Sequence, residues 1–449
     1  MTQGYRSGLG TVENEDGSQN VVLVTIDSLR ADHCGFLGSK YDLTPTLDRM
    51  AADGLAFETA IAPGPRTPSS MPVAFTGRFD WPRDVSWGNW QDRWSCIAEH
   101  LGRHRTIAEQ LRAAGYTTVG VTVNPWTHGT GFETGFDRLL ELEGAEAIKG
   151  SDTGSTVFQA LDWTLGRTDL GERYQWGNAR DWFVQWPQYY DRVLDLVQEA
   201  SDPYFLWVFL LDPHQPYLAP RTYRTEASAP TMYYANIRER ITGSPDELSA
   251  RLWTWLERSY RDAIRSTDAF LDTLQTDLAD DNPVFVVHAD HGEAFGEHGT
   301  YGHDESLYEE NLHVPLVVAN TANSETVQAP VSLRTLPRLI EQVATDEPVN
   351  REPIAQDHVV AATEGVQSQR RALRGRRWKY ITDGERQELY DLRSDPYETT
   401  DRADDRSELV DELDRLLHLR LRKDAEVVEI GRAIDAIDRH EFRQQEVSR

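Results

Sequence analysis

The sequence predicts an α/β fold, in which a doubly wound, mostly parallel sheet is flanked by helices and followed by a small C-terminal α+β subdomain. Two observations carry this prediction. Near-continuous apolar runs, typical of strands buried on both faces, alternate with segments of helical periodicity. After about residue 350 the apolar runs become short and turns separate them, which indicates antiparallel strands. A chain of 449 residues is long enough for one large domain and a smaller one.

The main domain is predicted to span residues 19–350, after a flexible tail at 1–18 that is rich in Gly, Ser and acidic residues. Its first strand is the run NVVLVTID, and its first helix is TPTLDRMAADG, with Thr44 as the N-cap and Pro45 at the first position. The expected strands lie at 20–27, 117–123, 204–212, 283–290 and 313–319, and the expected helices at 44–54, 104–114 and about 245–279. Residues 150–200, rich in Trp and Tyr, are expected to form an insertion between strands.

The C-terminal subdomain is predicted to span residues 351–449. The segments VVAATEG, RALRGRRWKYITD and QELYDL have the pattern of short antiparallel strands, with a turn at Asp383-Gly384. An acidic, Arg-rich helix is expected over about 406–423.

The amino-acid composition bears on the partners and the cellular location expected of this protein. The formal net charge is −28, which argues against a nucleic acid partner, because phosphate binding requires Lys and Arg patches. Only four of the 46 basic residues are lysine, and such an acidic, lysine-poor chain resembles those of salt-loving organisms; the alternative is an ordinary acidic soluble protein. Two cysteines make neither a disulfide framework nor a zinc cluster. No signal-peptide stretch and no apolar run of about 18 residues occurs, so we expect a cytoplasmic protein without a membrane span.

Polar residues stand at the ends of three predicted strands. Asp27 ends the first strand, Asp212 and His214 follow the third, and Asp290-His291 ends the fourth. Ligands of open α/β sheets bind beyond the carboxyl ends of the strands. Two carboxylates and an imidazole that meet there fit a site for a divalent cation. Each residue alone is better explained as a helix N-cap or a surface histidine, but three strand ends together favour a metal site.

Six blocks along the chain resemble the sulfatase family of the alkaline phosphatase superfamily, in the family's order and over nearly the whole length. They are VVLVTIDSLRADHCGFLG…TPTLDRMAADGLAFETAIA, GPRTPSSMPVAFTGR, GYTTVGVTVN…GFETGFD, LLDPHQPY, HADHGEAFGEHGTYGH…EENLHVPLVV and RALRGRRWKYI…ELYDLRSDPYETTD. This resemblance implies a sulfatase-like catalytic domain, in which Asp27, Asp290 and His291 match metal ligands.

The resemblance also implies roles for several other residues. His214 matches a histidine that contacts the transferred group or protonates the leaving group. His303 falls where the family has a cationic contact to the substrate oxyanion, and His298 is a second candidate for such a contact. His128 lies near the basic pair of the family's G-K-W-H segment, but the text here is NPWTHG, without the lysine, and Asn124 is expected to replace part of that function.

The nucleophile is assigned from the family's spacing, in which a nucleophile and Pro-Ser-Arg precede Thr-Gly. Nine residues before Thr76-Gly77 stands Thr67, whereas a count from Pro68 reaches Arg66, which cannot attack an ester. We therefore predict that Thr67 is both nucleophile and metal ligand.

Alternatives to this assignment remain open at this point. Ser69 and Ser70 are the other candidate nucleophiles, and Thr67 would otherwise be a turn residue flanked by proline. Arg66 is either a contact for an anionic substrate or a surface arginine.

Several positions depart from the family's pattern. Formylglycine is made from Cys or Ser, so Thr67 is not expected to become one; Met71 stands in place of an arginine, Ser28 in place of an aspartate and His291 in place of an asparagine. Each of these four residues differs from the residue that the calcium-dependent formylglycine enzymes have at that position. Each leads toward relatives with a threonine nucleophile, such as phosphoglycerol transferases, or toward phosphonate and phosphodiester hydrolases. An imidazole ligand favours Mn or Zn as the one divalent metal, with Ca or Mg as alternatives.

The sequence therefore predicts a metal-dependent hydrolase of sulfate or phosphate esters, which uses a metal-activated threonine. Its substrate is expected to be a small anionic ester or a sulfated or phosphorylated glycan. The alternatives are a phosphoryl or phosphoglycerol-type transferase, and a non-catalytic binding protein that retains the fold. The sequence carries no signal of oligomeric state.

Overall fold

The computed structural model describes residues 18–80, 90–142, 184–242, 247–303, 306–322, 324–345, 348–352, 354–363 and 370–424. The predicted tail at 1–18, except its last residue, most of the predicted insertion at 150–200 and the last residues of the C-terminal subdomain lie outside the described residues.

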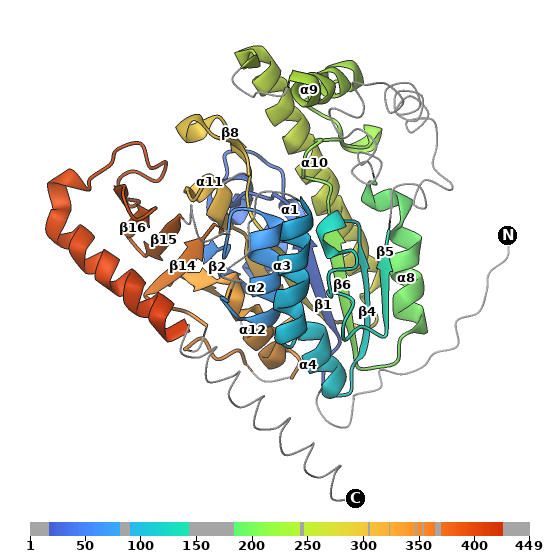
Figure 1. The fold of residues 1–449 in the computed structure, drawn as a ribbon. Coiled ribbons are helices and arrows are strands. Elements are labelled where there is room, and N and C mark those ends of the chain that lie inside the picture. The colour runs from blue at the N-terminus through green and yellow to red at the C-terminus, as the bar shows by residue number, and fades with distance from the viewer. Residues whose placement is uncertain are drawn as a thin grey trace, which may run out of the picture.

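The centre of the molecule is an eight-stranded sheet with the order β12-β2-β11-β7-β1-β6-β4-β5 (Figure 1). Its strands are β1 (Val21–Ile26), β2 (Leu55–Phe57), β4 (Thr117–Thr122), β5 (Arg138–Glu141), β6 (Tyr204–Leu210), β7 (Val284–Ala289), β11 (Leu316–Ala319) and β12 (Glu325–Val327). Only β11 runs antiparallel to its neighbours in this sheet. Every residue of β1, β6 and β7 is buried, as the continuous apolar runs predicted.

Helices cover both faces of the sheet, with α2, α3 and α12 in front of it in Figure 1 and α10 behind it. The helices are α1 (Pro45–Asp53), α2 (Thr67–Thr76), α3 (Trp90–Arg103), α4 (Ile107–Ala113), α8 (Tyr190–Glu199), α9 (Ala229–Thr242), α10 (Ala250–Asp277), α11 (Glu309–Leu312) and α12 (Leu336–Val343). Among the described residues, no helix is both long enough and apolar enough to cross a membrane. The predicted fold class is confirmed.

Two predicted elements differ from the structure. The helix predicted over 104–114 begins only at Ile107, because Thr106 is its N-cap and forms a capping box with Glu109. The single strand predicted over 313–319 is wrong. Pro315, which has no N–H, separates β10 (His313–Val314) from β11, and β10 pairs instead with β3 (Ala60–Ile61) in a small three-stranded sheet with β13 (Val331–Ser332).

The C-terminal subdomain is an antiparallel sheet of four strands, β14 (His358–Ala362), β15 (Arg371–Gly375), β16 (Trp378–Thr382) and β17 (Gln387–Asp391). A helix over 407–424, the red helix of Figure 1, packs on it. Alternate residues of the strands face this helix and form a second core, which contains Val360, Leu373, Tyr380, Leu389, Val410, Leu413 and Leu417.

A buried histidine in α3 predicts a pH dependence of stability. His100 is fully buried; its Nδ1 donates to the Asp80 carbonyl at 2.7 Å, and its Nε2 lies 2.9 Å from Thr76 Oγ1. Burial lowers the pKa of His100 from 6.5 to about 4. Between these pH values the imidazole is therefore protonated in the unfolded chain and neutral in the folded protein. The corresponding stability is complete above pH 6.5 and is lost as the pH falls toward 4, an effect on the order of 3 kcal/mol.

His100→Gln, which does not titrate, is expected to remove this part of the pH dependence. Urea denaturation of both proteins at pH 7.5 and 4.5 (chosen on either side of the histidine range) measures it. An equal loss of stability in the two proteins between these pH values would contradict the prediction.

Candidate metal and active site

The register of the three central strands brings their polar ends together. Ile26, at the end of β1, is paired with Leu210 of β6 on one side and with Ala289 of β7 on the other. Asp27 and Asp290 each follow such an end residue, and the Asp290 N–H donates to the Ile26 carbonyl at 3.2 Å. Two residues far apart in the sequence therefore lie side by side at the carboxyl edge of the sheet.

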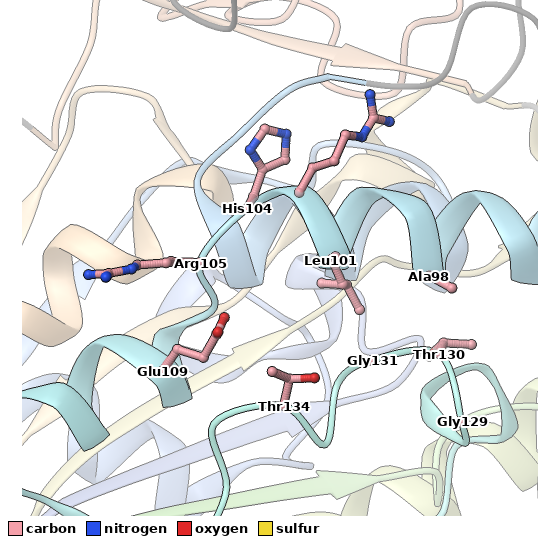
Figure 2. A pocket seen from close by; sticks show the side chains of 11 residues that line it. Ala98, Leu101, His104, Arg105, Glu109, Gly129, Thr130, Gly131 and Thr134 are labelled. Atoms are coloured by element: carbon pink, nitrogen blue, oxygen red, sulfur yellow. The ribbon is translucent and has the colours of Figure 1, made fainter. Parts of the chain in front are cut away.

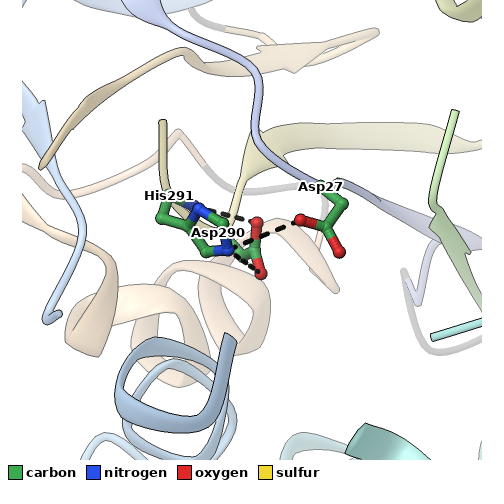
Figure 3. A group of neighbouring side chains, drawn as sticks. All are labelled: Asp27, Asp290 and His291. Atoms are coloured by element: carbon green, nitrogen blue, oxygen red, sulfur yellow. Dashed lines mark hydrogen bonds and ion pairs between the residues drawn. The ribbon is translucent and has the colours of Figure 1, made fainter. Parts of the chain in front are cut away.

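Asp27, Asp290 and His291 form a compact group that is completely buried (Figure 3). One ligand atom from each lies within 4.8 Å of the others. His291 Nε2 is 3.4 Å from Asp27 Oδ1 and 3.5 Å from Asp290 Oδ2. His291 Nδ1 donates to the Gly292 carbonyl at 2.8 Å, which leaves the Nε2 lone pair directed at the carboxylates.

Burial changes the pKa values of all three side chains of this group. Burial raises the pKa of Asp290 to about 7, and burial together with the charge of Asp290 raises the pKa of Asp27 well above its usual range. Burial lowers the pKa of His291 to about 4, so the imidazole is neutral. Two buried carboxylates beside a neutral imidazole are costly unless a cation joins them. The donor set of two oxygens and one nitrogen fits a divalent metal.

Thr67 is the first residue of α2 and lies against Asp290 and His291. Its Oγ1 donates to Asp290 Oδ2 at 2.8 Å and lies 3.3 Å from His291 Nε2. Arg66 precedes the helix in extended conformation, and Pro68 occupies its first turn, where the missing N–H costs nothing. The N-terminus of α2, which is the positive end of its dipole, therefore lies at the Thr67 hydroxyl group.

The other two hydroxyl groups of this segment contact backbone atoms. Ser69 Oγ donates to the Arg66 carbonyl at 2.9 Å, and Ser70 Oγ donates to the Asp290 carbonyl at 2.6 Å. Of the three candidate nucleophiles, Thr67 is the one whose oxygen contacts the carboxylate and imidazole side chains of the cluster.

Asn124 contacts both Asp27 and Thr67. It follows β4, and its Nδ2 donates to Asp27 Oδ2 at 2.7 Å and lies 3.5 Å from Thr67 Oγ1. Arg66 is buried beside Thr67. His128 lies at the end of the short turn η3 (Pro125–Thr127), and its buried Nε2 has no hydrogen-bond partner.

A second group of polar side chains adjoins the first. The His303 ring lies 4.7 Å from the ring of His291 and 4.9 Å from that of His214, centroid to centroid. His303 Nδ1 is 3.2 Å from a carboxylate oxygen of Glu293, whose pKa burial raises to about 7. His214 Nδ1 donates to the Gln215 carbonyl at 2.6 Å, and burial lowers the pKa of His214 to about 3. The rings of His214, His303 and His291 thus lie next to one another.

The sequence reasoning missed Glu293 as part of this group. A signal was present, since Glu293 stands two residues after His291 at the end of a buried strand, but its contact with His303 depends on the turn between β8 (Ala294–Phe295) and β9 (Tyr301–Gly302).

Two of the residues singled out from the sequence are engaged elsewhere. His298 uses both ring nitrogens, toward Glu310 Oε1 at 2.9 Å and the Glu398 carbonyl at 3.1 Å, and stacks on Tyr308. Asp212 accepts a hydrogen bond from the Trp186 N–H at 3.3 Å and does not join His214.

A cavity of about 290 Å³ lies apart from this cluster (Figure 2). It is bounded by α3, the start of α4 and the loop at 129–134, and the side chains of Glu109 and Thr134 border it. None of the metal-cluster residues lines it.

Comparison with known proteins gives concordant similarities. Residues 19–345 match the family model described as Sulfatase. The chain is 24% identical over 473 aligned residues to arylsulfatase K of Canis lupus familiaris, across 89% of this chain and 82% of that protein. A solved 2-O GAG sulfatase is similar with a TM-score of 0.65 at 16% identity, over 91% of this chain and 93% of that one. The phosphonate monoester hydrolase of Agrobacterium radiobacter is similar with a TM-score of 0.63 at 16% identity, over 90% and 96%.

Proposed function

Because the chain belongs to the sulfatase family, a family of ester hydrolases, we propose that it hydrolyses sulfate or phosphate esters with Thr67 as the nucleophile. The observation that carries this proposal is the 2.8 Å contact between Thr67 Oγ1 and Asp290 Oδ2, within the cluster that fits a divalent metal. A divalent metal held by Asp27, Asp290, His291 and Thr67 would lower the pKa of the threonine hydroxyl and neutralise an oxygen of the bound ester.

Each step of the proposed reaction is assigned to particular side chains. Thr67 Oγ1 gives its proton to Asp290 Oδ2, to which it donates a hydrogen bond, and forms a bond to sulfur or phosphorus. The bond from that atom to the alcohol oxygen breaks, and the alcohol oxygen takes a proton. Asn124, whose Nδ2 lies 3.5 Å from Thr67 Oγ1, is the proposed contact for an oxygen of the bound group, together with Arg66 and His128, and the N-terminus of α2 adds the helix dipole beside Thr67. Water finally displaces the group from Thr67.

His303 is the proposed donor of the proton to the leaving alcohol, with His214 beside it. Glu293 contacts Nδ1 of His303 and so orients the ring. His303→Ala is expected to lower kcat by about 10²–10⁴-fold for alkyl esters, whose alcohols need a proton to leave. The loss is expected to be much smaller for a 4-nitrophenyl ester, whose leaving group is stable as an anion.

Turnover of both ester classes by the variant, compared with the wild type at fixed pH, measures this dependence. An equal loss for both classes, with a raised KM, would instead assign His303 to binding of the ester oxyanion.

A panel of esters tests the function itself. Aryl sulfate, phosphate monoester, phosphodiester and phosphonate substrates are assayed with the metal-stripped protein resupplied with Mn, Zn, Ca or Mg. A sulfated glycan is included because one of the similar solved structures is a 2-O GAG sulfatase. Formation of a new ester with added glycerol would indicate a transferase, and absence of both turnover and metal binding would leave a binding protein.

A further inference from the structure

The C-terminal subdomain holds a buried cluster of charges against the segment that carries His303. The cluster consists of Glu309, Arg374, Lys379 and Glu398, and we call it the clasp. Lys379 Nζ lies 3.0 Å from Glu309 Oε1 and 2.9 Å from Glu398 Oε1, and Arg374 Nη2 lies 3.0 Å from Glu309 Oε2. Glu309 begins α11, which belongs to the main domain, whereas the other three residues belong to the C-terminal subdomain (Figure 1).

The choice of lysine at this position is informative. The chain uses arginine almost everywhere, and Lys379 is one of only four lysines. Its side chain is completely buried between two carboxylates. A compact ammonium group with three donors suits this space, while a planar guanidinium is larger. The space between the two carboxylates therefore favours an ammonium group at position 379. An exposed surface ion pair does not require such a close fit.

The clasp also fixes the backbone at the start of α11. Glu398 Oε2 accepts the Glu309 N–H at 2.6 Å, so one carboxylate binds both Lys379 and the helix start. Glu398 itself has a φ of 54°, a conformation that a non-glycine residue holds only when its surroundings impose it. Its carbonyl group accepts a hydrogen bond from His298, in the turn between β8 and β9.

From α11 the contacts lead directly to the catalytic residues. The Gly292 and Glu293 N–H groups donate to the carbonyls of Asn311 and Glu310, both at 2.9 Å. The approach is so close that a Cβ atom on Gly292 would lie 2.0 Å from the Glu310 carbonyl oxygen. Asn311 Nδ2 donates to the Gly302 carbonyl at 2.9 Å. The residue before Gly292 is His291, and the residue after Gly302 is His303.

We propose that Lys379 is a positioning residue, which acts through Glu309 and α11 to hold His303 in place beside His291. The C-terminal subdomain thus supports the active site through the contacts of the clasp with α11. The inference rests on the proposed function only for its kinetic consequence, since the contacts that hold the segment exist whatever ester is bound.

Lys379→Met tests the inference, with Arg377→Met as the matched control. Arg377 lies two residues away in the same sheet region and pairs with Asp391, but half of its side chain is exposed. Hydrogen exchange of the peptides that cover 292–303 is measured in both variants and the wild type. Lys379→Met is expected to speed exchange of these amides by about tenfold or more, while Arg377→Met leaves them unchanged. Faster exchange confined to 371–398, with 292–303 unchanged, would overturn the proposal.

The kinetic consequence separates positioning from loss of stability. Lys379→Met is expected to lower kcat about 10²-fold with little change in KM, because a displaced His303 no longer reaches the leaving oxygen. In a His303→Ala background the same substitution is expected to change kcat by less than about threefold, because the residue through which it acts is absent. Losses that multiply in the double variant would contradict the proposal.

A second variant covers the case in which Lys379→Met does not fold, and hydrogen exchange covers the case in which the protein hydrolyses no ester. If Lys379→Met does not fold, Glu398→Gln, which retains the shape of the side chain and loses its charge, replaces it in every comparison. If the wild type hydrolyses no ester and binds no metal, the proposed function has failed, whereas the hydrogen-exchange comparison still decides the inference.

Discussion

Replacing Thr67 with alanine is expected to lower kcat by about three orders of magnitude or more, while the protein remains folded and Asp27, Asp290 and His291 still bind the metal. The reason is that neither of the other two candidate nucleophiles can replace it, since the hydroxyl groups of Ser69 and Ser70 donate to backbone carbonyls. Thr67→Ser is the matched control, because it retains the hydroxyl group and loses only a methyl group. Steady-state kinetics and metal content are measured on the same preparations.

The control also tests the departure from the formylglycine enzymes. Thr67→Ser is expected to retain a substantial part of the activity, and mass spectrometry of the wild type is expected to show an unmodified threonine that gains a sulfuryl or phosphoryl group during turnover. Undiminished turnover by Thr67→Ala with metal bound would exclude Thr67 as the nucleophile.

Removal of the metal is expected to abolish hydrolysis and to lower Tm by several degrees. The carboxylates of Asp27 and Asp290 are buried side by side, and a bound cation would offset the cost of burying their charges. A metal present at roughly 1,000 times its Kd adds about 4 kcal/mol to the free energy of unfolding. Thermal denaturation with EDTA, and again after Mn or Zn is restored, measures the shift.

His291→Ala is expected to remove most of this metal-dependent shift, because it deletes the nitrogen ligand. His288→Gln is the matched control: His288 is buried in β7, three residues before His291, but contacts Thr25 Oγ1 and the Ala289 carbonyl. It is expected to lower Tm with and without metal and to leave the difference between the two unchanged. A full metal-dependent shift in His291→Ala would contradict the proposed ligand set, and activity with bound Ca alone would contradict the preference for Mn or Zn.

The sequence by itself determined the fold class and the residues at the strand ends. Strands buried on both faces must be apolar along their whole length, so β1, β6 and β7 are visible as runs such as VVLVTI. A polar residue directly after such a run has no packing role, and in a parallel sheet it faces the edge where ligands bind. Asp27, Asp290 and His291 were identified on this ground, and the structure brings them together.

Only the tertiary structure decided which other side chains meet them. Thr67 and Asp290 are 223 residues apart, and their contact depends on how α2 packs on the sheet. The same packing commits His298 to the clasp and brings Glu293 to His303. Local patterns specify burial and periodicity, whereas such contacts depend on turn geometry and on the register between distant segments. The clasp is the clearest case, since Lys379 meets Glu309 at the start of α11 across 70 residues of sequence.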